Sequence, residues 1–174
     1  VDIVKGGAIP SVFMPAVERG VRQALATGVV AGFPLQDIRV TVHDGKTHAV
    51  DGKEIAFVTA GCKATLDAVR NAAPILLEPM VNVEVVAPEH AMGDLTGDLA
   101  GRRGHVTGTQ SRVAGSVSIS AVAPLAELEN YQGRLKSLTG GKGAYSVAFS
   151  HYAQAPGGVQ HELASKYRAA EIDD

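Results

Sequence analysis

The sequence predicts an α+β fold whose second half is a ferredoxin-like domain. Between Leu76 and Tyr152 the apolar pattern gives the order β-α-β-β-α-β, and the tripeptide Val-Ala-Pro opens both helices. In a domain with this order, right-handed crossovers pack both helices on one face of an antiparallel sheet and leave the other face free. The first half instead predicts a helix, a strand with an exposed tip, and a second helix.

The first helix is expected to begin near Pro15, because proline suits the first turn of a helix. From there Val17, Val21 and Leu25 recur every four residues and predict a buried stripe, with charged residues on the opposite face. Gly28 follows the last residue of this pattern and is expected to end the helix.

Residues 37–57 predict an exposed tip held between two rigid elements. The alternation of Ile38, Val40 and Val42 is typical of a half-buried strand. The pair Asp44-Gly45 favours a tight turn, because glycine tolerates a positive φ. An exposed tip of this kind is suited to contact a partner, and its polar residues include His43, Asp44, Lys46 and His48.

The second helix is expected to start at a capping box formed by Asp51 and Glu54. Apolar residues spaced three and four apart predict a buried stripe, which includes the single cysteine, Cys62. One cysteine excludes an internal disulfide, and its apolar position favours core packing over a role as nucleophile. Pro74 ends this helix.

The elements of the second half follow from the same patterns. Helices are expected to start after Pro88 and Pro124. Residues 154–158 predict a loop rich in proline and glycine, and residues 159–172 predict a terminal helix. The expected strands are residues 76–87, 104–113, 116–123 and 144–152.

The composition is that of a globular protein of 174 residues, one domain or two small ones, with 45% hydrophobic residues. The net charge of −2 conceals segregation, because residues 74–101 contain acidic residues and no Lys or Arg, whereas residues 102–142 are mainly basic. No signal peptide is recognisable, and no apolar run approaches the ~20 residues of a spanning helix. Because the chain begins with Val1 and not Met, we expect it to be a piece of a longer protein.

Motifs for catalysis or metal binding do not emerge. Residues 140–143, Gly-Gly-Lys-Gly, lack the upstream glycine and the Ser/Thr of a P-loop, and they lie between a helix and a strand, the reverse of the P-loop order. His161-Glu162 lacks a second histidine four residues on, and no Cys-x-x-Cys exists. His43 and His48 fit solvated loop residues better than metal ligands. We therefore expect no catalysis and no bound cofactor in this chain.

Polyanion binding is the class of function left open. Arg102 and Arg103 follow a helix and open a strand, and Lys142 lies before the last strand. We expect these positions, which precede the second strand of each half, to gather at one end of the sheet and neutralise phosphates. The alternative is that they are helix C-terminal cations interacting with the helix dipole.

Three segments, in order, carry a family resemblance. Together they cover nearly the whole chain and resemble the C-terminal part of the translational GTPase elongation factor G. They are Lys5-Gly6-Gly7-Ala8-Ile9-Pro10 with Pro15-Ala16-Val17 and Gly20; Ala31-Gly32-Phe33-Pro34 with His48, Val50, Asp51 and Ala56-Phe57; and Leu77-Glu78-Pro79-Met80 with Gly93-Asp94, Gly97-Asp98-Leu99, Arg102-Arg103-Gly104, Pro124-Leu125-Ala126-Glu127, Ser137-Leu138-Thr139 and Lys142.

The resemblance implies a domain organisation. Residues 1–73 would form an incomplete domain IV, a ribosomal-protein-like β-α-β domain without its opening strands. Residues 74–153 would form the ferredoxin-like domain V, and residues 154–174 a C-terminal helix that packs back toward the first domain. The implied fragment is a non-enzymatic, cytoplasmic monomer, and its parent is a GTPase that binds GTP and Mg in a domain absent here.

The family's activity is GTP-driven movement of tRNA and mRNA through the ribosome. The resemblance implies that the tip reaches the decoding region beside A-site tRNA, and that His48 matches the family's functionally important tip histidine. It also implies contact between domain V and large-subunit rRNA. The implied partners are rRNA of both subunits, A-site tRNA and mRNA, with no membrane. The implied contact residues are Asp44, Lys46, Thr47 and His48 at the tip, and Arg102, Arg103 and Lys142 in domain V.

Some residues depart from the family pattern. Thr47, Ala49 and Gly52 differ from the usual tip residues, and Lys142 stands where arginine is usual, so that bidentate phosphate geometry is lost. The departures favour, as an alternative, a paralogue that acts in ribosome recycling or ribosome protection. A more distant alternative is a stand-alone ferredoxin-like module that binds a small ligand on its free sheet face.

Overall fold

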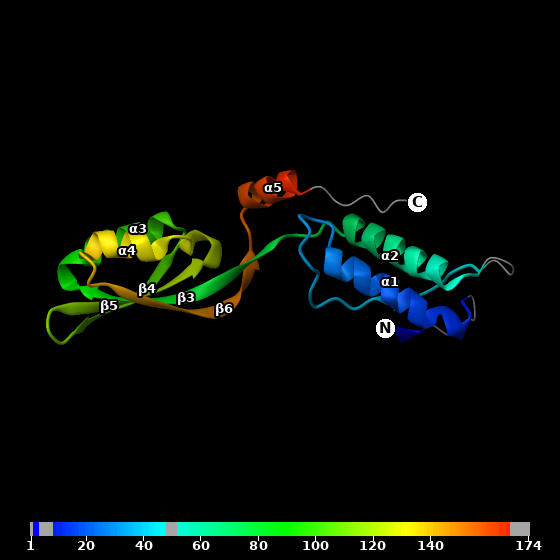
Figure 1. The fold of residues 1–174 in the computed structure, drawn as a ribbon, viewed down its shortest axis with the longest axis horizontal. Coiled ribbons are helices and arrows are strands. Elements are labelled where there is room, and N and C mark those ends of the chain that lie inside the picture. The colour runs from blue at the N-terminus through cyan, green and yellow to red at the C-terminus, as the bar shows by residue number, and fades with distance from the viewer. Residues whose placement is uncertain (1, 4–8, 48–51, 168–174) are drawn as a thin grey trace. The chain divides into compact units, whose positions relative to one another are not determined.

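The computed structural model describes residues 2–3, 9–47 and 52–167. The chain divides into two compact units, one made of residues 1–76 and 156–174 and the other of residues 77–155 (Figure 1). Each unit has its own hydrophobic core.

The first unit is built on two long helices that lie side by side (Figure 1). A 3-10 turn, η1 (Ser11–Phe13), leads into α1 (Met14–Thr27), which has Pro15 in its first turn as expected. Gly28 ends α1 with a φ of 66°, a conformation that disfavours other residues. The second helix, α2 (Glu54–Asn71), follows the tip.

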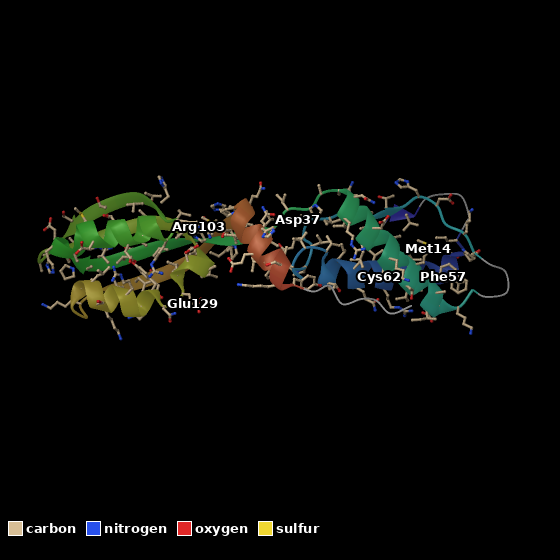
Figure 2. The ribbon with its side chains drawn as sticks, turned by 90° about the horizontal axis from the view of Figure 1, so that it is seen from above. Met14, Asp37, Phe57, Cys62, Arg103 and Glu129 are labelled. Atoms are coloured by element: carbon tan, nitrogen blue, oxygen red, sulfur yellow. The ribbon has the colours of Figure 1, made fainter. Side chains whose placement is uncertain are left out.

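Glycines allow α1 and α2 to approach closely. A Cβ at Gly20 would lie 2.0 Å from the carbonyl oxygen of Val58, and one at Gly61 would lie 2.7 Å from that of Val17. Around this crossing the core contains Ala16, Val17, Val21, Phe57 and Val58, and a second cluster contains Ala24, Cys62 and Leu66. Phe57 and Cys62 lie along α2 (Figure 2), and the burial of Cys62 confirms its core position.

The strand before the tip is shorter than its alternation predicts. Only Thr41–Val42 (β2) forms a ladder among the described residues, in parallel with Asp2–Ile3 (β1). Val40 and Val42 pack against the core as expected, but the side chain of Ile38 is exposed. With few strand partners, this segment has few backbone hydrogen bonds to hold it in a regular strand.

The predicted capping box is wrong. Lys53 is the N-cap of α2 and makes no side-chain cap hydrogen bond, so Glu54 is the first helical residue instead of the third. The carboxylate of Glu54 pairs with Arg19 on α1, an interaction between helices that sequence spacing does not reveal. Asp51 lies outside the described residues.

The C-terminal helix α5 (Gly157–Lys166) contacts the first unit and ends earlier than its predicted limit. The backbone N–H of Leu76 donates to the side-chain oxygen of Gln160 over 3.0 Å. The ring of Tyr167 lies against Gly32, where a Cβ would come within 2.4 Å of it.

The second unit is a four-stranded antiparallel sheet in the order β4-β5-β3-β6, with both helices on one face (Figure 1). This arrangement confirms the ferredoxin-like prediction. The helix expected directly after Pro124 is instead a 3-10 turn, because Asn130, at a φ of 58°, separates it from the α-helix. The elements are β3 (Leu77–Pro88), η2 (Glu89–Ala91), α3 (Met92–Gly101), β4 (His105–Arg112), β5 (Ser116–Pro124), η3 (Leu125–Leu128), α4 (Tyr131–Thr139) and β6 (Ala144–Gln154).

Alternate residues of β3 and β5 form the core of the second unit. Val81, Val83 and Val85 face the helices and meet Leu95, Leu99, Tyr131 and Leu135, among others. The register places the intervening residues, such as Glu84 and Ser120, on the opposite face. The core therefore lies between the sheet and the two helices, which fixes the ends of α3 and α4 where the basic residues lie.

Candidate nucleic-acid interface

The described part of the tip presents exposed polar groups. Asp44, Lys46 and Thr47 are exposed, and the carboxylate of Asp44 accepts a hydrogen bond of 2.7 Å from the N–H of Gly45. The tight turn predicted at Asp44-Gly45 is wrong, because residues 43–47 form no turn and Gly45 does not have a positive φ; a Cβ at Gly45 would lie 2.4 Å from the side chain of Ile9. His48 lies outside the described residues, so its predicted role stays a prediction.

An apolar groove of 790 Å³ lies beside the segment that carries the tip. One wall is residues 35–46, and the other is α2, with Ala60, Ala64 and Ala68 among its lining residues. Its walls are mainly apolar, so the groove is not suited to bind phosphate. The exposed polar groups nearest to this groove are those of the tip.

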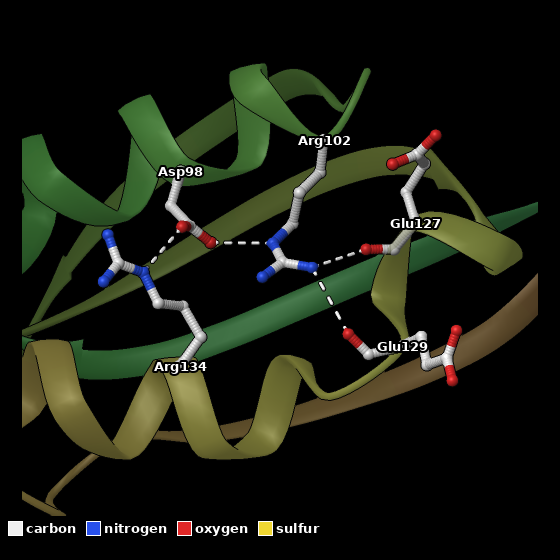
Figure 3. Close-up of polar contacts among 5 residues, drawn as sticks. All are labelled: Asp98, Arg102, Glu127, Glu129 and Arg134. Carbon is white, nitrogen blue, oxygen red and sulfur yellow. Dashed lines mark hydrogen bonds and ion pairs between the residues drawn. The ribbon is translucent and has the colours of Figure 1, made fainter.

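Arg102 lies at the C-terminal end of α3 and is fully engaged within the second unit. Its Nε donates to Asp98 over 2.9 Å, and one terminal nitrogen donates to the carbonyl oxygen of Glu127 over 2.6 Å (Figure 3). Its guanidinium also lies 5.2 Å from the centre of the Tyr131 ring, within the range of a cation–π contact. Arg102 therefore joins α3 to the start of α4.

The carboxylate of Asp98 forms ion pairs with two arginines, Arg102 and Arg134, between the helices. Its other carboxylate oxygen accepts a 2.9 Å hydrogen bond from Arg134 of α4 (Figure 3). Burial on its own would raise the pKa of the Asp98 carboxyl, but the hydrogen bonds and positive charges of Arg102 and Arg134 outweigh it and lower the pKa. The groove of 480 Å³ between α3 and α4 is thus lined by charges that neutralise one another.

Tyr131 lies beneath this network with its hydroxyl buried. That hydroxyl has no hydrogen-bond partner within the described part of the chain. Burial, followed by the negative charge of Asp98, raises the pKa of Tyr131 to about 12. The ring meets Tyr145 edge-on, with centroids 5.0 Å apart.

Arg103 is held by two carboxylates from distant parts of the chain. Its two terminal nitrogens donate to the two oxygens of Glu78 over 2.7 and 2.9 Å, and its Nε donates to Glu127 over 2.8 Å. The hydrogen bonds to Glu78 are the leading cause that raises the pKa of Arg103, so the group stays charged. The two predicted phosphate ligands, Arg102 and Arg103, therefore already have anionic or carbonyl partners.

The expectation that Arg102, Arg103 and Lys142 gather at one end of the sheet is wrong. Arg103 binds Glu78 near the start of β3, whereas Ala144, two residues after Lys142, pairs with Val86 near the end of β3. The two βαβ halves run antiparallel, because β3 and β5 are antiparallel neighbours. Equivalent positions in the two halves must therefore lie at opposite ends of the sheet.

The end of the sheet that contains Lys142 has a second exposed lysine. Lys136 lies in the last turn of α4, and the loop that follows contains Gly140 and Gly141, both at positive φ. Neither Lys136 nor Lys142 has an ion-pair partner among residues 9–47 and 52–167. Sequence reasoning missed Lys136, although its place at a helix end six residues before Lys142 is a signal that could have found it.

Comparison with known proteins decides the family. The family model for elongation factor G, domain IV, matches residues 1–73, and the model for the elongation factor G C-terminus matches residues 75–163. The chain belongs to the elongation factor G family. A crystal structure of a protein from Thermus thermophilus is 38% identical, with a TM-score of 0.79 over 94% of this chain. The chain covers 24% of that protein.

The described residues contain neither a side-chain cluster suited to a metal ion nor a helix suited to a membrane. No group of three or more His, Cys, Asp or Glu side chains in the described ranges could hold a metal ion. None of the helices in those ranges is both long and apolar enough to cross a membrane. Among the exposed polar surfaces of this elongation factor G fragment are the tip of the first unit and the lysine end of the second.

Proposed function

We propose that this chain is the ribosome-binding C-terminal part of an elongation factor G-type translational GTPase that promotes movement of tRNA and mRNA. The observation that carries the proposal is the ordered match of domain IV and the C-terminus of the family over residues 1–163. The tip would contact the decoding region, with Asp44, Lys46, Thr47 and His48 as contact residues. The fragment would act in the cytoplasm without catalysis of its own, while the parent binds GTP and Mg.

Within the second unit we assign the rRNA contact to Lys136 and Lys142. Unpaired ammonium groups can take up phosphate without first breaking an internal ion pair, whereas Arg102 and Arg103 would have to give up carboxylates. The loop at residues 140–143 contains three glycines, so phosphate can approach its backbone closely. These features support a phosphate contact at this end of the sheet.

The contact is tested by binding of the 174-residue chain to purified ribosomes over a range of salt concentrations. Each lysine that contacts phosphate contributes about 0.7–0.9 to the slope of log K against log salt. We expect Lys136→Gln and Lys142→Gln each to lower the slope by about that amount. The matched control is Lys166→Gln, which removes the same charge from an exposed pair with Glu162 and leaves the slope unchanged. An unchanged slope in both lysine variants would contradict the assignment.

Translocation is tested with a hybrid in which this chain replaces the corresponding quarter of a full-length elongation factor G. We expect GTP-dependent translocation in single-turnover measurements, and a marked loss of rate for His48→Ala in the hybrid. The departures at Thr47, Ala49 and Gly52 favour the second candidate, a paralogue for ribosome recycling or protection. A hybrid that separates ribosomal subunits but does not translocate would overturn the first proposal in favour of the second.

A further inference from the structure

The second unit contains a two-stranded ribbon that extends beyond its four-stranded body. β5 pairs with β3 only from Met80 onward, so residues 77–79 pair with β6 alone, at residues 152–154 (Figure 1). The register of β3 with β6 shifts between Met80 and Val81, at the base of this ribbon. A two-stranded ribbon is marginally stable by itself, and an irregularity at its base is a point where a strand bends.

The ribbon buries little apolar surface. Leu77 and Tyr152 are each 49% exposed. By contrast, the side chain of Glu78 is only 12% exposed, and the guanidinium of Arg103 binds both of its carboxylate oxygens. The ring of Tyr152 also meets that of Phe149 in the body, with centroids 5.3 Å apart, but the fork of hydrogen bonds from Arg103 is the ion pair that joins the ribbon to the turn after α3.

The backbone at Arg103 has a conformation that glycine adopts more easily than arginine. Arg103 has a φ of 57°, and it donates from its N–H to Ala100 while Gly104 donates to Leu99. These two bonds form a Schellman motif, in which Arg103 occupies the position that glycine usually takes. An arginine in this left-handed conformation costs about 1 kcal/mol relative to glycine. The strain is offset by what the guanidinium holds: Glu78 on β3 and Glu127 on η3.

We propose that Arg103 is a latch that fastens the ribbon to the turn between α3 and β4, and that its release lets the ribbon open and bend while the four-stranded body stays folded. The chain passes between the two units at residues 76–77 and 155–156, at the end of this ribbon. The latch therefore sets the stiffness of the segment that connects the units. This inference stands independently of the proposed ribosomal function.

The test is amide hydrogen exchange by mass spectrometry on the full chain. In Arg103→Gly we expect exchange of the ribbon, residues 77–80 and 151–154, to become about tenfold faster or more, because charge-assisted hydrogen bonds are lost. Exchange of the body, residues 81–87 and 117–123, should not become faster, because glycine relieves the backbone strain at that position. If Arg103 served only to end helix α3, the Arg103→Gly variant would show the opposite result, because glycine suits that position better. Exchange would then become slower in both the ribbon and the body.

Two further variants keep the test decisive. Glu78→Gln removes the charge of the latch without touching the strained turn, and it should also accelerate the ribbon selectively. Arg112→Gln breaks the ion pair with Glu84 on the same strand β3 and should leave the ribbon unchanged. Equal acceleration of ribbon and body in both latch variants, or no acceleration of the ribbon, would overturn the proposal.

Discussion

Tyr131 is the largest fully buried side chain of the second unit, and its hydroxyl has no hydrogen-bond partner among the described residues. A buried polar group without a partner destabilises the folded state by its full cost of desolvation. The ring stabilises the fold, since it contacts both the ring of Tyr145 and the Arg102 guanidinium. The ring and the hydroxyl therefore have opposite effects on stability.

We expect Tyr131→Phe to raise the free energy of unfolding by about 1 kcal/mol at pH 7, because it keeps the ring and removes the hydroxyl. The raised pKa adds a pH dependence: the stabilisation of the neutral phenol is present below pH 10 and is lost as pH rises toward 12. Urea unfolding at pH 7 and pH 11 measures both effects. Tyr152→Phe, at an exposed ring, is the control, and a less stable Tyr131→Phe would contradict the prediction.

Asp98 gives the second unit a sensitivity to acid. Its pKa is lowered in the folded state from the usual 3.8, so its stabilisation is complete well above that pH and is lost as pH falls through the lower folded value. We expect Asp98→Asn to lower the free energy of unfolding by about 2 kcal/mol at pH 7, since the group that accepts hydrogen bonds from two arginines loses its negative charge. The variant should also lose less stability than the parent chain between pH 5 and pH 2. The expectation would be refuted if the free energy of unfolding fell with pH equally steeply in the variant and in the parent chain.

At the scale of elements, the glycines within the helices differ in whether close packing requires them. Gly20 and Gly61 let α1 and α2 approach, whereas Gly93 and Gly97 of α3 have no atom within 4 Å of a Cβ position. The same residue type is therefore required in one pair of helices and dispensable for packing in the other.

We expect Gly61→Ala to destabilise the first unit by about 1–3 kcal/mol, because the new methyl group would meet the backbone of α1. Gly97→Ala is the matched change in an uncrowded helix, and it should stabilise the second unit by about 0.5–1 kcal/mol through helix propensity. Calorimetry that resolves the two units can assign each shift. A Gly61→Ala protein as stable as the parent would mean that the helices separate at little cost.

The order of elements in the second unit could be predicted from sequence, because alternation along strands and spacing along helices are local. The first unit is harder to predict. The distance between Asp51 and Glu54 suggests a cap, but the partner of Glu54 is Arg19, 35 residues away on another helix. A short range of sequence does not contain that information.

The candidate site shows the same limit more sharply. The exposure of Asp44 and Lys46 follows from their polar side chains, which are visible in the sequence, although the tight turn predicted at Asp44-Gly45 is not formed. The partners of Arg102 and Arg103 are not, since Glu78 and Glu127 approach them only after β3, α3 and η3 are assembled. The predicted gathering with Lys142 is wrong because equivalent positions in a repeat need not be neighbours in space.

At the scale of the whole chain, family membership is established over residues 1–73 and 75–163, and the structure adds where charge is still available. Most basic groups of the α3–β4 turn are neutralised internally. The exposed lysines, Lys136 and Lys142, lie where α4 ends, at the opposite end of the sheet from Arg103.

The antiparallel relation of the two βαβ halves has a consequence for electrostatics. At one end of the sheet, guanidinium and carboxylate groups cancel over a few ångströms, so their field decays quickly into solvent. At the other end Lys136 and Lys142 form no ion pair among residues 9–47 and 52–167, although the carboxylates of Glu89 and Asp94 lie at the same end of the unit. A phosphate that approaches this end would therefore add an ion pair within the Debye length, ~8 Å at physiological salt, whereas at the arginine end it would have to exchange one.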